Sequence, residues 1–139
     1  MMRVFLDTNV LLDVLGDRRP FVEHAKSIWM LAERGRITGL VSTLSFSNIF
    51  YILRKYTDAE TALMSLRHLR ANFTPVVCDQ GIIDHALASD FRDFEDAVQY
   101  FSARNADAEC IVTRDSGHFA TALIAVLSPE QFLATHRLA

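Results

Sequence analysis

Two aspartates follow short segments that read as buried strands. Asp7 comes directly after Arg3–Leu6, and Asp115 comes just after Cys110–Thr113. Short, continuously apolar runs of this kind are typical of strands that are covered on both faces. In an open parallel sheet, the residues that follow the strands lie at the carboxyl edge, where ligands bind. We therefore expect both carboxylates at one edge of a sheet.

A third aspartate, Asp96, can reach the same edge. It lies in the first turn of a helix that Asp93 is expected to cap, about a quarter-turn from the apolar face marked by Ala97 and Phe101. Carboxylates that converge without a nearby lysine repel one another unless a divalent cation neutralises them. Because ligand sets made of oxygen alone suit Mg²⁺ or Mn²⁺ rather than zinc, the three aspartates predict a site for one of these ions.

Each of these acids also has a purely structural interpretation. An aspartate between a strand and a helix often caps the helix, and for any one of the three alone we favour that role. Acids in the first turn of a helix also complement its dipole, as Asp93, Glu95 and Asp96 would. The joint pattern favours the metal site, because capping has to be invoked separately at every strand end.

The apolar pattern predicts the elements that position these side chains. Helical patterns alternate with short strands, which indicates an α/β fold with a central parallel sheet of four to five strands flanked by helices. No linker or internal repeat divides the chain, so residues 1–139 are expected to form one domain. Strands are expected at 3–6, 37–41, 74–78, 110–113 and 124–127, and helices at 20–34 and after caps within 42–45 and at Asp58, Asp79 and Asp93.

Two details of this prediction concern the second half of the chain. The helix after Asp93 is expected to bury Phe94, Ala97, Val98 and Phe101 on one face. The dipeptide Ser128–Pro129 is expected to stop the last strand.

Composition indicates a folded protein without a strongly basic surface. Half of the 139 residues are apolar and 22% are charged, which excludes disorder, and the net charge of −3 gives no sign of a broadly basic nucleic-acid binder. Cys78 and Cys110 match no zinc or disulfide pattern. Arg3 and Asp7 interrupt any secretory signal, and no apolar run approaches the length of a membrane span. We therefore expect a soluble cytoplasmic protein that has no contact with membranes.

Three segments carry short acidic motifs: Val4–Asp13 (VFLDTNVLLD), Asp93–Ala97 (DFEDA) and Ile111–Asp115 (IVTRD). They resemble the motifs of the PIN domain, and the resemblance runs the length of the chain. It is closest to the compact bacterial PIN proteins that include VapC-type toxins. It implies a parallel sheet with acids clustered at one edge, which binds Mg²⁺ or Mn²⁺ and hydrolyses phosphodiester bonds in RNA.

The resemblance also implies a role for each polar residue in these segments. Asp7, Asp96 and Asp115 take the positions of the family's catalytic acids and metal ligands. Groups that would orient these carboxylates are Thr8, Asn9, Asp93 and Thr113. Candidate phosphate contacts are Arg114 and His118, which flank Asp115, and the pairs Arg18–Arg19 and Arg54–Lys55, with a solvated surface charge as the alternative for each.

One position departs from the family's pattern. The family has a fourth acid, a glutamate, in the helix after the second strand, and Asn48 stands at the matching place in this sequence. We count Asn48 among the catalytic positions, because asparagine keeps an oxygen that can act as a ligand. It lacks the negative charge, however, so weaker metal binding or a smaller number of metal ions is expected.

Three functions compete at this point. The first is a metal-dependent endoribonuclease of the toxin type, for which the resemblance implies an RNA substrate, a homodimer and a small antitoxin that inserts a segment into the acidic site. The second is a phosphatase of the haloacid dehalogenase type, which is disfavoured because Asn9 replaces its second acid and no lysine lies at a strand end. The third is a PIN scaffold that binds nucleic acid or protein without catalysis, for which Asn48 is the best evidence. The sequence favours the ribonuclease.

Overall fold

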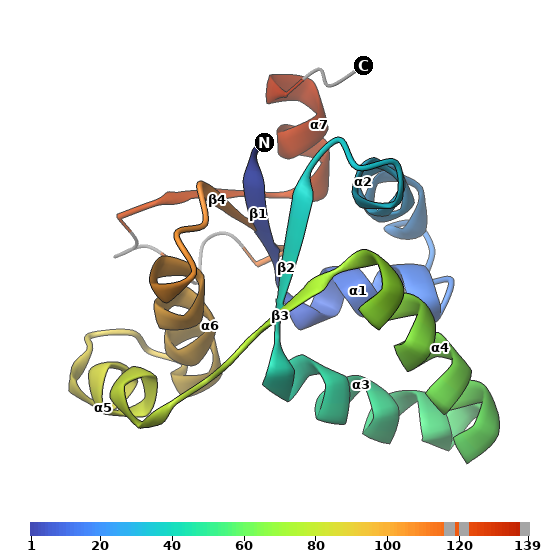
Figure 1. The fold of residues 1–139 in the computed structure, drawn as a ribbon, viewed down its shortest axis with the longest axis horizontal. Helices are drawn as coiled ribbons and strands as arrows, with labels where there is room; N and C mark the ends of the chain where they lie inside the picture. Colours follow the sequence, from blue (N-terminus) through green and yellow to red (C-terminus); the bar gives the residue numbers. More distant parts are fainter. Residues whose placement is uncertain (116–118, 120–122, 137–139) are drawn as a thin grey trace.

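The structure, a computed structural model, describes residues 1–115, 119 and 123–136 and is built on a five-stranded parallel sheet (Figure 1). All four strand pairs are parallel, and Val4 lies opposite Gly39 on one side and Cys110 on the other. The expected α/β sheet is therefore confirmed. The strands are β1 (Arg3–Leu6), β2 (Thr38–Ser42), β3 (Thr74–Val76), β4 (Cys110–Val112) and β5 (Ala125–Leu127), and their spatial order is β3-β2-β1-β4-β5.

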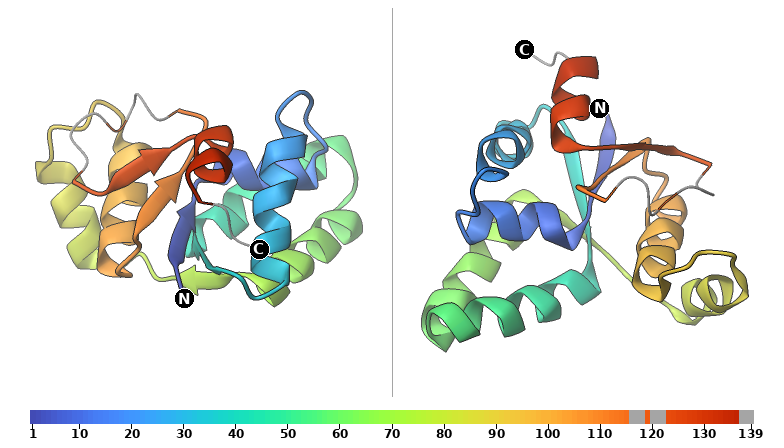
Figure 2. Two further views of the ribbon diagram at one scale, coloured as in Figure 1. Left: turned by 90° about the horizontal axis from the view of Figure 1, so that it is seen from above. Right: turned by 180° about the vertical axis from the view of Figure 1, so that it is seen from behind.

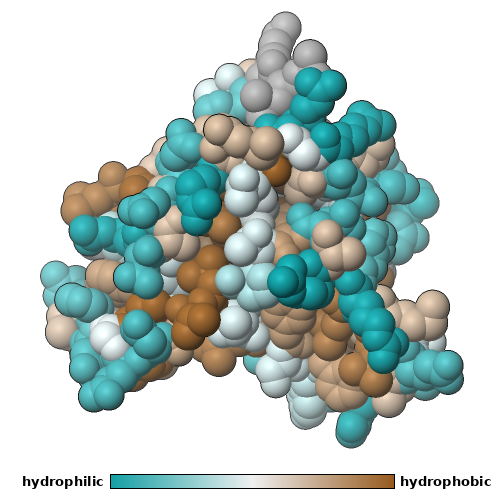
Figure 3. Space-filling model, viewed as in Figure 1, coloured by the Kyte–Doolittle hydropathy of each residue, from teal (hydrophilic) through white to brown (hydrophobic). Residues whose placement is uncertain are grey.

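Helices cover both faces of the sheet (Figures 1 and 2). One face carries α1 (Thr8–Leu15), α2 (Val22–Glu33), α3 (Thr43–Tyr56), α4 (Ala59–Asn72) and α7 (Pro129–Thr135). The other face carries α5 (Gln80–Ala88) and α6 (Phe94–Asn105). Hydrophilic residues follow most of the outline of the surface in this view, and hydrophobic ones gather nearer the middle (Figure 3). In the described residues, no helix is long and apolar enough to cross a bilayer.

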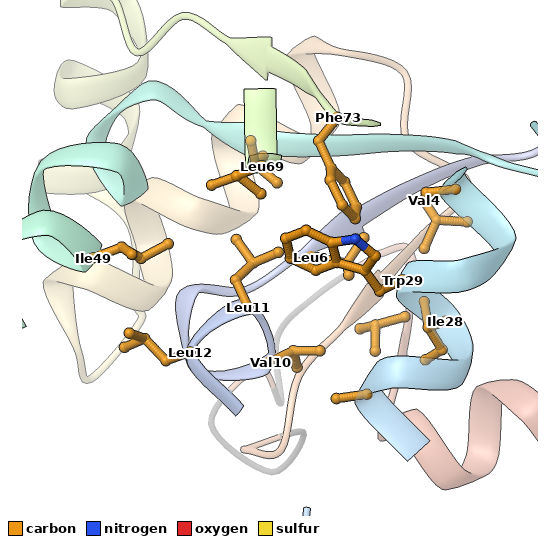
Figure 4. Close-up of a cluster of buried hydrophobic side chains, with 14 of the residues drawn as sticks. Val4, Leu6, Val10, Leu11, Leu12, Ile28, Trp29, Ile49, Leu69 and Phe73 are labelled. Atoms are coloured by element: carbon orange, nitrogen blue, oxygen red, sulfur yellow. The ribbon is translucent and has the colours of Figure 1, made fainter. Parts of the chain in front are cut away.

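Strand β1 supplies side chains to the cores on both faces. Val4 and Leu6 point into the core that is filled from α2 by Trp29 (Figure 4), whereas Phe5 points into the core that contains Tyr100 of α6. Successive side chains of a strand alternate between the two faces, so a strand covered on both sides is apolar throughout. This burial explains the uninterrupted apolar run that ends at Asp7.

The order of the strands reverses beside β1. The chain moves outward from β1 through β2 and β3, and then returns to form β4 on the other side of β1. The backbone N–H of Asp7 donates to the carbonyl of Val112, 3.0 Å away, so the carboxyl ends of β1 and β4 meet at this reversal. In open α/β sheets, ligands bind in the crevice at such a point.

Two helices go beyond the sequence prediction. Residues 8–15, for which no element is predicted, form α1, which Asp7 caps and which buries Val10 and Leu11. Ser128 and Pro129 do end the last strand, but they also begin α7, where Ser128 forms a capping box with Gln131. Both helices are short, so the apolar period is repeated too few times to predict them.

On the predicted core face of α6, one residue is wrong. Phe94 is 48% exposed, whereas Ala97 and Val98 are buried as expected and Phe101 is partly buried. Phe94 is the first residue of α6, and it therefore lies at the end of the helix and outside the contact with the core.

Candidate functional site

A cleft of about 640 Å³ lies at the carboxyl ends of β1 and β4. The residues that line it come from the segment after β1, from α3, from the start of α6 and from the segment after β4. The sheet and its helices thus bring together side chains that are far apart in the sequence. The lining includes all four predicted catalytic positions, Asp7, Asn48, Asp96 and Asp115, together with Asp93 and Glu95.

Asp7 is the most buried acid of the cleft, with 5% of its surface exposed. Its Oδ1 accepts hydrogen bonds from the backbone N–H of Thr8 at 2.7 Å and from Nε2 of Gln99 at 3.2 Å. Its Oδ2 accepts a bond from the Thr113 hydroxyl at 2.8 Å. Burial raises the pKa of the Asp7 carboxyl, the three donors oppose this shift, and the negative charge of Asp115 adds to it.

Asn9 and Thr113 connect Asp7 with Asp115. The Asn9 side-chain amide donates to Oδ2 of Asp115 at 3.0 Å and to Oδ2 of Asp7 at 3.4 Å. The Thr113 hydroxyl, which donates to Asp7, also accepts the backbone N–H of Asp115 at 3.1 Å. These bonds fix the positions of two carboxylates relative to each other, as expected for groups that orient metal ligands.

Thr8 contacts the acid differently from the way the sequence suggests. Its backbone N–H binds Asp7, but its hydroxyl lies 2.7 Å from the hydroxyl of Ser45 and accepts a bond from Gln99 at 3.2 Å. The Thr8 side chain therefore ties α1 to α3 and α6, and it is the backbone N–H of Thr8 that binds the Asp7 carboxylate.

The first turn of α6 contributes three acids to the cleft. Asp93 caps the helix by accepting the backbone N–H of Asp96 at 3.0 Å, and Asp96 itself is 8% exposed. Glu95 also lines the cleft. Burial raises the pKa of Glu95, and the negative charges of Asp7 and Asp93 raise it further.

Two polar residues of this site are missing from the sequence prediction. Gln99 is 4% exposed and binds Asp7, although 92 positions separate them. Its spacing from Asp96, three residues along a helix, was the signal available, since such positions share a helix face. For Glu95, the sequence predicts only an acid that complements the helix dipole. The position of Glu95 between Asp93 and Asp96 was the sequence signal that could have placed it in the cleft.

Arg114 does not line the acidic cleft. Its Nε and Nη2 donate to the carboxylate of Asp13 at 2.8 and 3.2 Å, and its guanidinium lies over the ring of Phe21, 4.0 Å from the centroid. The Asp13 side chain is fully buried, and Arg18 lies 3.9 Å from it. These contacts account for Arg114 without a phosphate. His118, the other predicted phosphate contact beside Asp115, lies outside the described residues.

The donor set of the cleft suits a hard cation. All its acids offer oxygen, the ligand that Mg²⁺ and Mn²⁺ prefer, and a cation would relieve the unfavourable burial of the Asp7 charge. In the part of the chain that the structure describes, the side chains of His, Cys, Asp and Glu form no group of three that could already hold a metal ion.

The sequence comparisons define the family. Residues 3–117 match the sequence model described as the PIN domain. The chain belongs to the PIN domain family. Among curated proteins, this PIN domain is similar to ribonuclease VapC1 from Aquifex aeolicus, with 23% identity over 135 residues, which cover 94% of this chain and 92% of that protein.

Solved structures share the fold of this PIN domain. A toxin–antitoxin complex from Klebsiella pneumoniae matches with a TM-score of 0.68 and 22% identity, covering 91% of this chain and 97% of that chain. VapBC-1 from nontypeable Haemophilus influenzae matches with a TM-score of 0.69 and 15% identity, covering 93% of this chain and 99% of that chain. The parallel sheet and its flanking helices are therefore those of known PIN structures.

Proposed function

We propose that this PIN domain is a metal-dependent endoribonuclease and the toxin of a type II toxin–antitoxin pair. The observation that carries the proposal is the convergence of Asp7, Asp96 and Asp115 from three separate segments on one cleft at the reversal of the strand order. The similarity to a protein named a ribonuclease supports the class of reaction.

The cleft offers what phosphodiester hydrolysis requires. Asp7, Asp96 and Asp115 would hold a Mg²⁺ or Mn²⁺ ion, which would activate a water molecule and offset negative charge on the phosphate. Asn9 and Thr113 keep the carboxylates of Asp7 and Asp115 in fixed orientations, so little reorganisation is needed when substrate binds. Asp93 holds the first turn of α6 by its cap and thereby positions Asp96.

The partners follow from the same proposal. RNA is the substrate, and the protein works in the cytoplasm as a homodimer. Its inhibitor is a small antitoxin that inserts a segment into the acidic cleft, a role supported by the similarity to a toxin–antitoxin complex.

A PIN scaffold without catalysis is the second candidate, and Asn48 is the observation that favours it. Asn48 lines the cleft at the position where the family has a glutamate, so the cleft has one charge fewer for binding a metal. A scaffold of this kind binds nucleic acid or protein and leaves the RNA intact.

A cleavage assay with paired variants tests the nuclease proposal. Incubation of a mixed-sequence RNA with Mn²⁺ should give cleavage that EDTA stops. Asp96→Asn should slow it by about 100-fold or more, because it removes a ligand charge from the cleft and keeps the size and shape of the side chain. Asp58→Asn is the matched control, since Asp58 only caps α4, where it accepts the Thr61 N–H at 2.7 Å.

The controls make the result decisive. Circular dichroism should show that both variants are folded. If Asp96→Asn is folded and cuts as fast as the wild type, Asp96 acts only at the helix terminus and the nuclease site is assigned wrongly.

A further inference from the structure

The cleft has an apolar part as well as its acids. Leu12, Tyr51 and Ile52 belong to its lining, and Tyr51 is the one aromatic residue among the described residues that line it. Leu12 is buried, but 60% of the surface of Tyr51 is exposed. An aromatic side chain in the cleft is thus open to a ligand.

The charge of the cleft makes it a poor surface for phosphate alone. Its described lining contains five carboxylates and a single cation, Arg18, which lies 3.9 Å from Asp13. Proteins that bind nucleic acid ordinarily gain most of their affinity from cations that contact phosphates. A chain of RNA in this cleft therefore needs contacts that do not depend on phosphate, and stacking of a base on an aromatic ring is one such contact.

A cation lies over one face of this ring. Nζ of Lys55, one turn further along α3, is 4.3 Å from the centroid of the Tyr51 ring. Lys55 does not belong to the lining of the cleft, so its charge lies outside the group of carboxylates. The ammonium covers one face of the ring, so a base has to stack on the opposite face. The ring and the positive charge together suit a nucleotide, which offers a flat base and a phosphate.

We propose that Tyr51 is the platform on which a base of the RNA substrate stacks beside the reacting phosphate, and that Lys55 contacts the backbone phosphate next to that base. The proposal rests on the proposed nuclease function. It makes Tyr51 a residue that determines how substrate binds, with no part in the metal site. The base contributes by its π-face, so any base can occupy the platform.

The first test is equilibrium binding of RNA, which does not require cleavage. The probe is a fluorescein-labelled, mixed-sequence RNA of about 12 nucleotides, a length within the usual range of single-strand sites, measured by anisotropy in Ca²⁺. Tyr51→Ala should weaken binding by about tenfold, and Tyr51→Phe, which keeps the ring, should stay within about twofold of wild type. Lys55→Ala should weaken binding less and reduce its salt dependence.

Tyr56→Ala is the matched control. Tyr56 lies on the same helix and is 81% exposed, but it does not line the cleft. It should bind RNA like the wild type. In the cleavage assay, Tyr51→Ala should raise KM by about tenfold and leave kcat within about twofold, because stacking binds the substrate and does not act on the reacting atoms.

An abasic substrate identifies the stacked base. Wild type should lose about tenfold in affinity when one nucleotide lacks its base, and Tyr51→Ala should not distinguish the two RNAs, because each change removes the same contact. The platform is overturned if Tyr51→Ala binds RNA as tightly as Tyr56→Ala does. It is also overturned if the wild type and Tyr51→Ala lose affinity by the same factor with every abasic RNA. Tyr51 would then be available to a protein partner.

The two proposals fail separately. A wild type that binds RNA through Tyr51 but cuts nothing in Mn²⁺ overturns the nuclease and supports the platform. If the wild type cuts RNA and Tyr51→Ala binds and cuts it equally well, the nuclease is supported and the platform is overturned. A wild type that binds no RNA overturns the platform as well.

Discussion

Asn48 and Asp7 line the same cleft in contrasting environments. Asp7 is buried and receives four hydrogen bonds, whereas Asn48 is exposed on α3. A charge at position 48 would remain accessible to water, so it should be tolerated by the fold. The residue at this position therefore adjusts the charge of the cleft without much effect on stability.

Asn48→Glu should strengthen Mn²⁺ binding by about tenfold and increase the rate of RNA cleavage, because it adds a fourth carboxylate. The measurements are a metal titration and the cleavage assay. Ser47→Glu is the control, since Ser47 also lines the cleft and receives the same charge. No change with Asn48→Glu would mean that position 48 does not face the metal. If the wild type leaves RNA intact and only Asn48→Glu cleaves it, the result would favour the PIN scaffold without catalysis.

Among the elements, α1 does most to organise the site. Asp7 caps it, Asn9 in its first turn bridges two carboxylates, and Asp13 near its end binds Arg114. Arg114 directly precedes Asp115, and its backbone N–H donates to Asn9 at 3.4 Å. Helix α1 is therefore bonded to the segment after β4 at two places, and this holds Asp115 beside Asp7.

Asp13→Asn should destabilise the protein by about 2 kcal/mol, because it leaves the Arg114 guanidinium without its charged partner. It should also weaken Mn²⁺ binding, since Asp115 is less firmly held. Urea unfolding of Asp13→Asn, Arg114→Gln and the double variant measures the coupling between the two residues, which we expect to exceed about 1 kcal/mol. Additive losses would contradict this positioning role.

For the whole molecule, the burial of the ionised Asp7 carboxylate is unfavourable. The raised pKa of Asp7 means that its ionised form is less stable in the folded protein than in the unfolded chain. Its contribution to stability is complete below the unfolded pKa and is lost as pH rises through the raised, folded pKa. A divalent cation that binds only the folded state reverses this loss.

In EDTA, Asp7→Asn should therefore melt at a higher temperature than wild type at pH 7, and the difference should narrow toward about pH 4, near the pKa of an unfolded aspartate. Millimolar Mn²⁺ should raise the melting temperature of wild type but hardly that of Asp7→Asn. Thermal melts across pH measure both effects. If the wild type melts at a higher temperature than Asp7→Asn in EDTA at every pH, this result contradicts the argument from burial. If Mn²⁺ leaves the melting temperature of the wild type unchanged, the metal site is excluded.

The sequence by itself determined the features that depend on neighbouring residues. Short apolar runs predicted the strands, because both faces of the sheet are covered. Asp58, Asp79 and Asp93 were predicted as helix caps, and each accepts a backbone N–H three residues further along the chain. The order of elements and the α/β class follow from these local signals.

The tertiary structure alone decided which side chains meet. The bond from Gln99 to Asp7 spans 92 positions, and the pair of Asp13 with Arg114 spans 101. Both depend on which strands are neighbours and on how α1 and α6 lie at the carboxyl edge, and periodicity carries no information on either. For the same reason, the sequence did not predict that Tyr51 lines the cleft. Its exposure there becomes visible only when α3 is placed beside the ends of the strands.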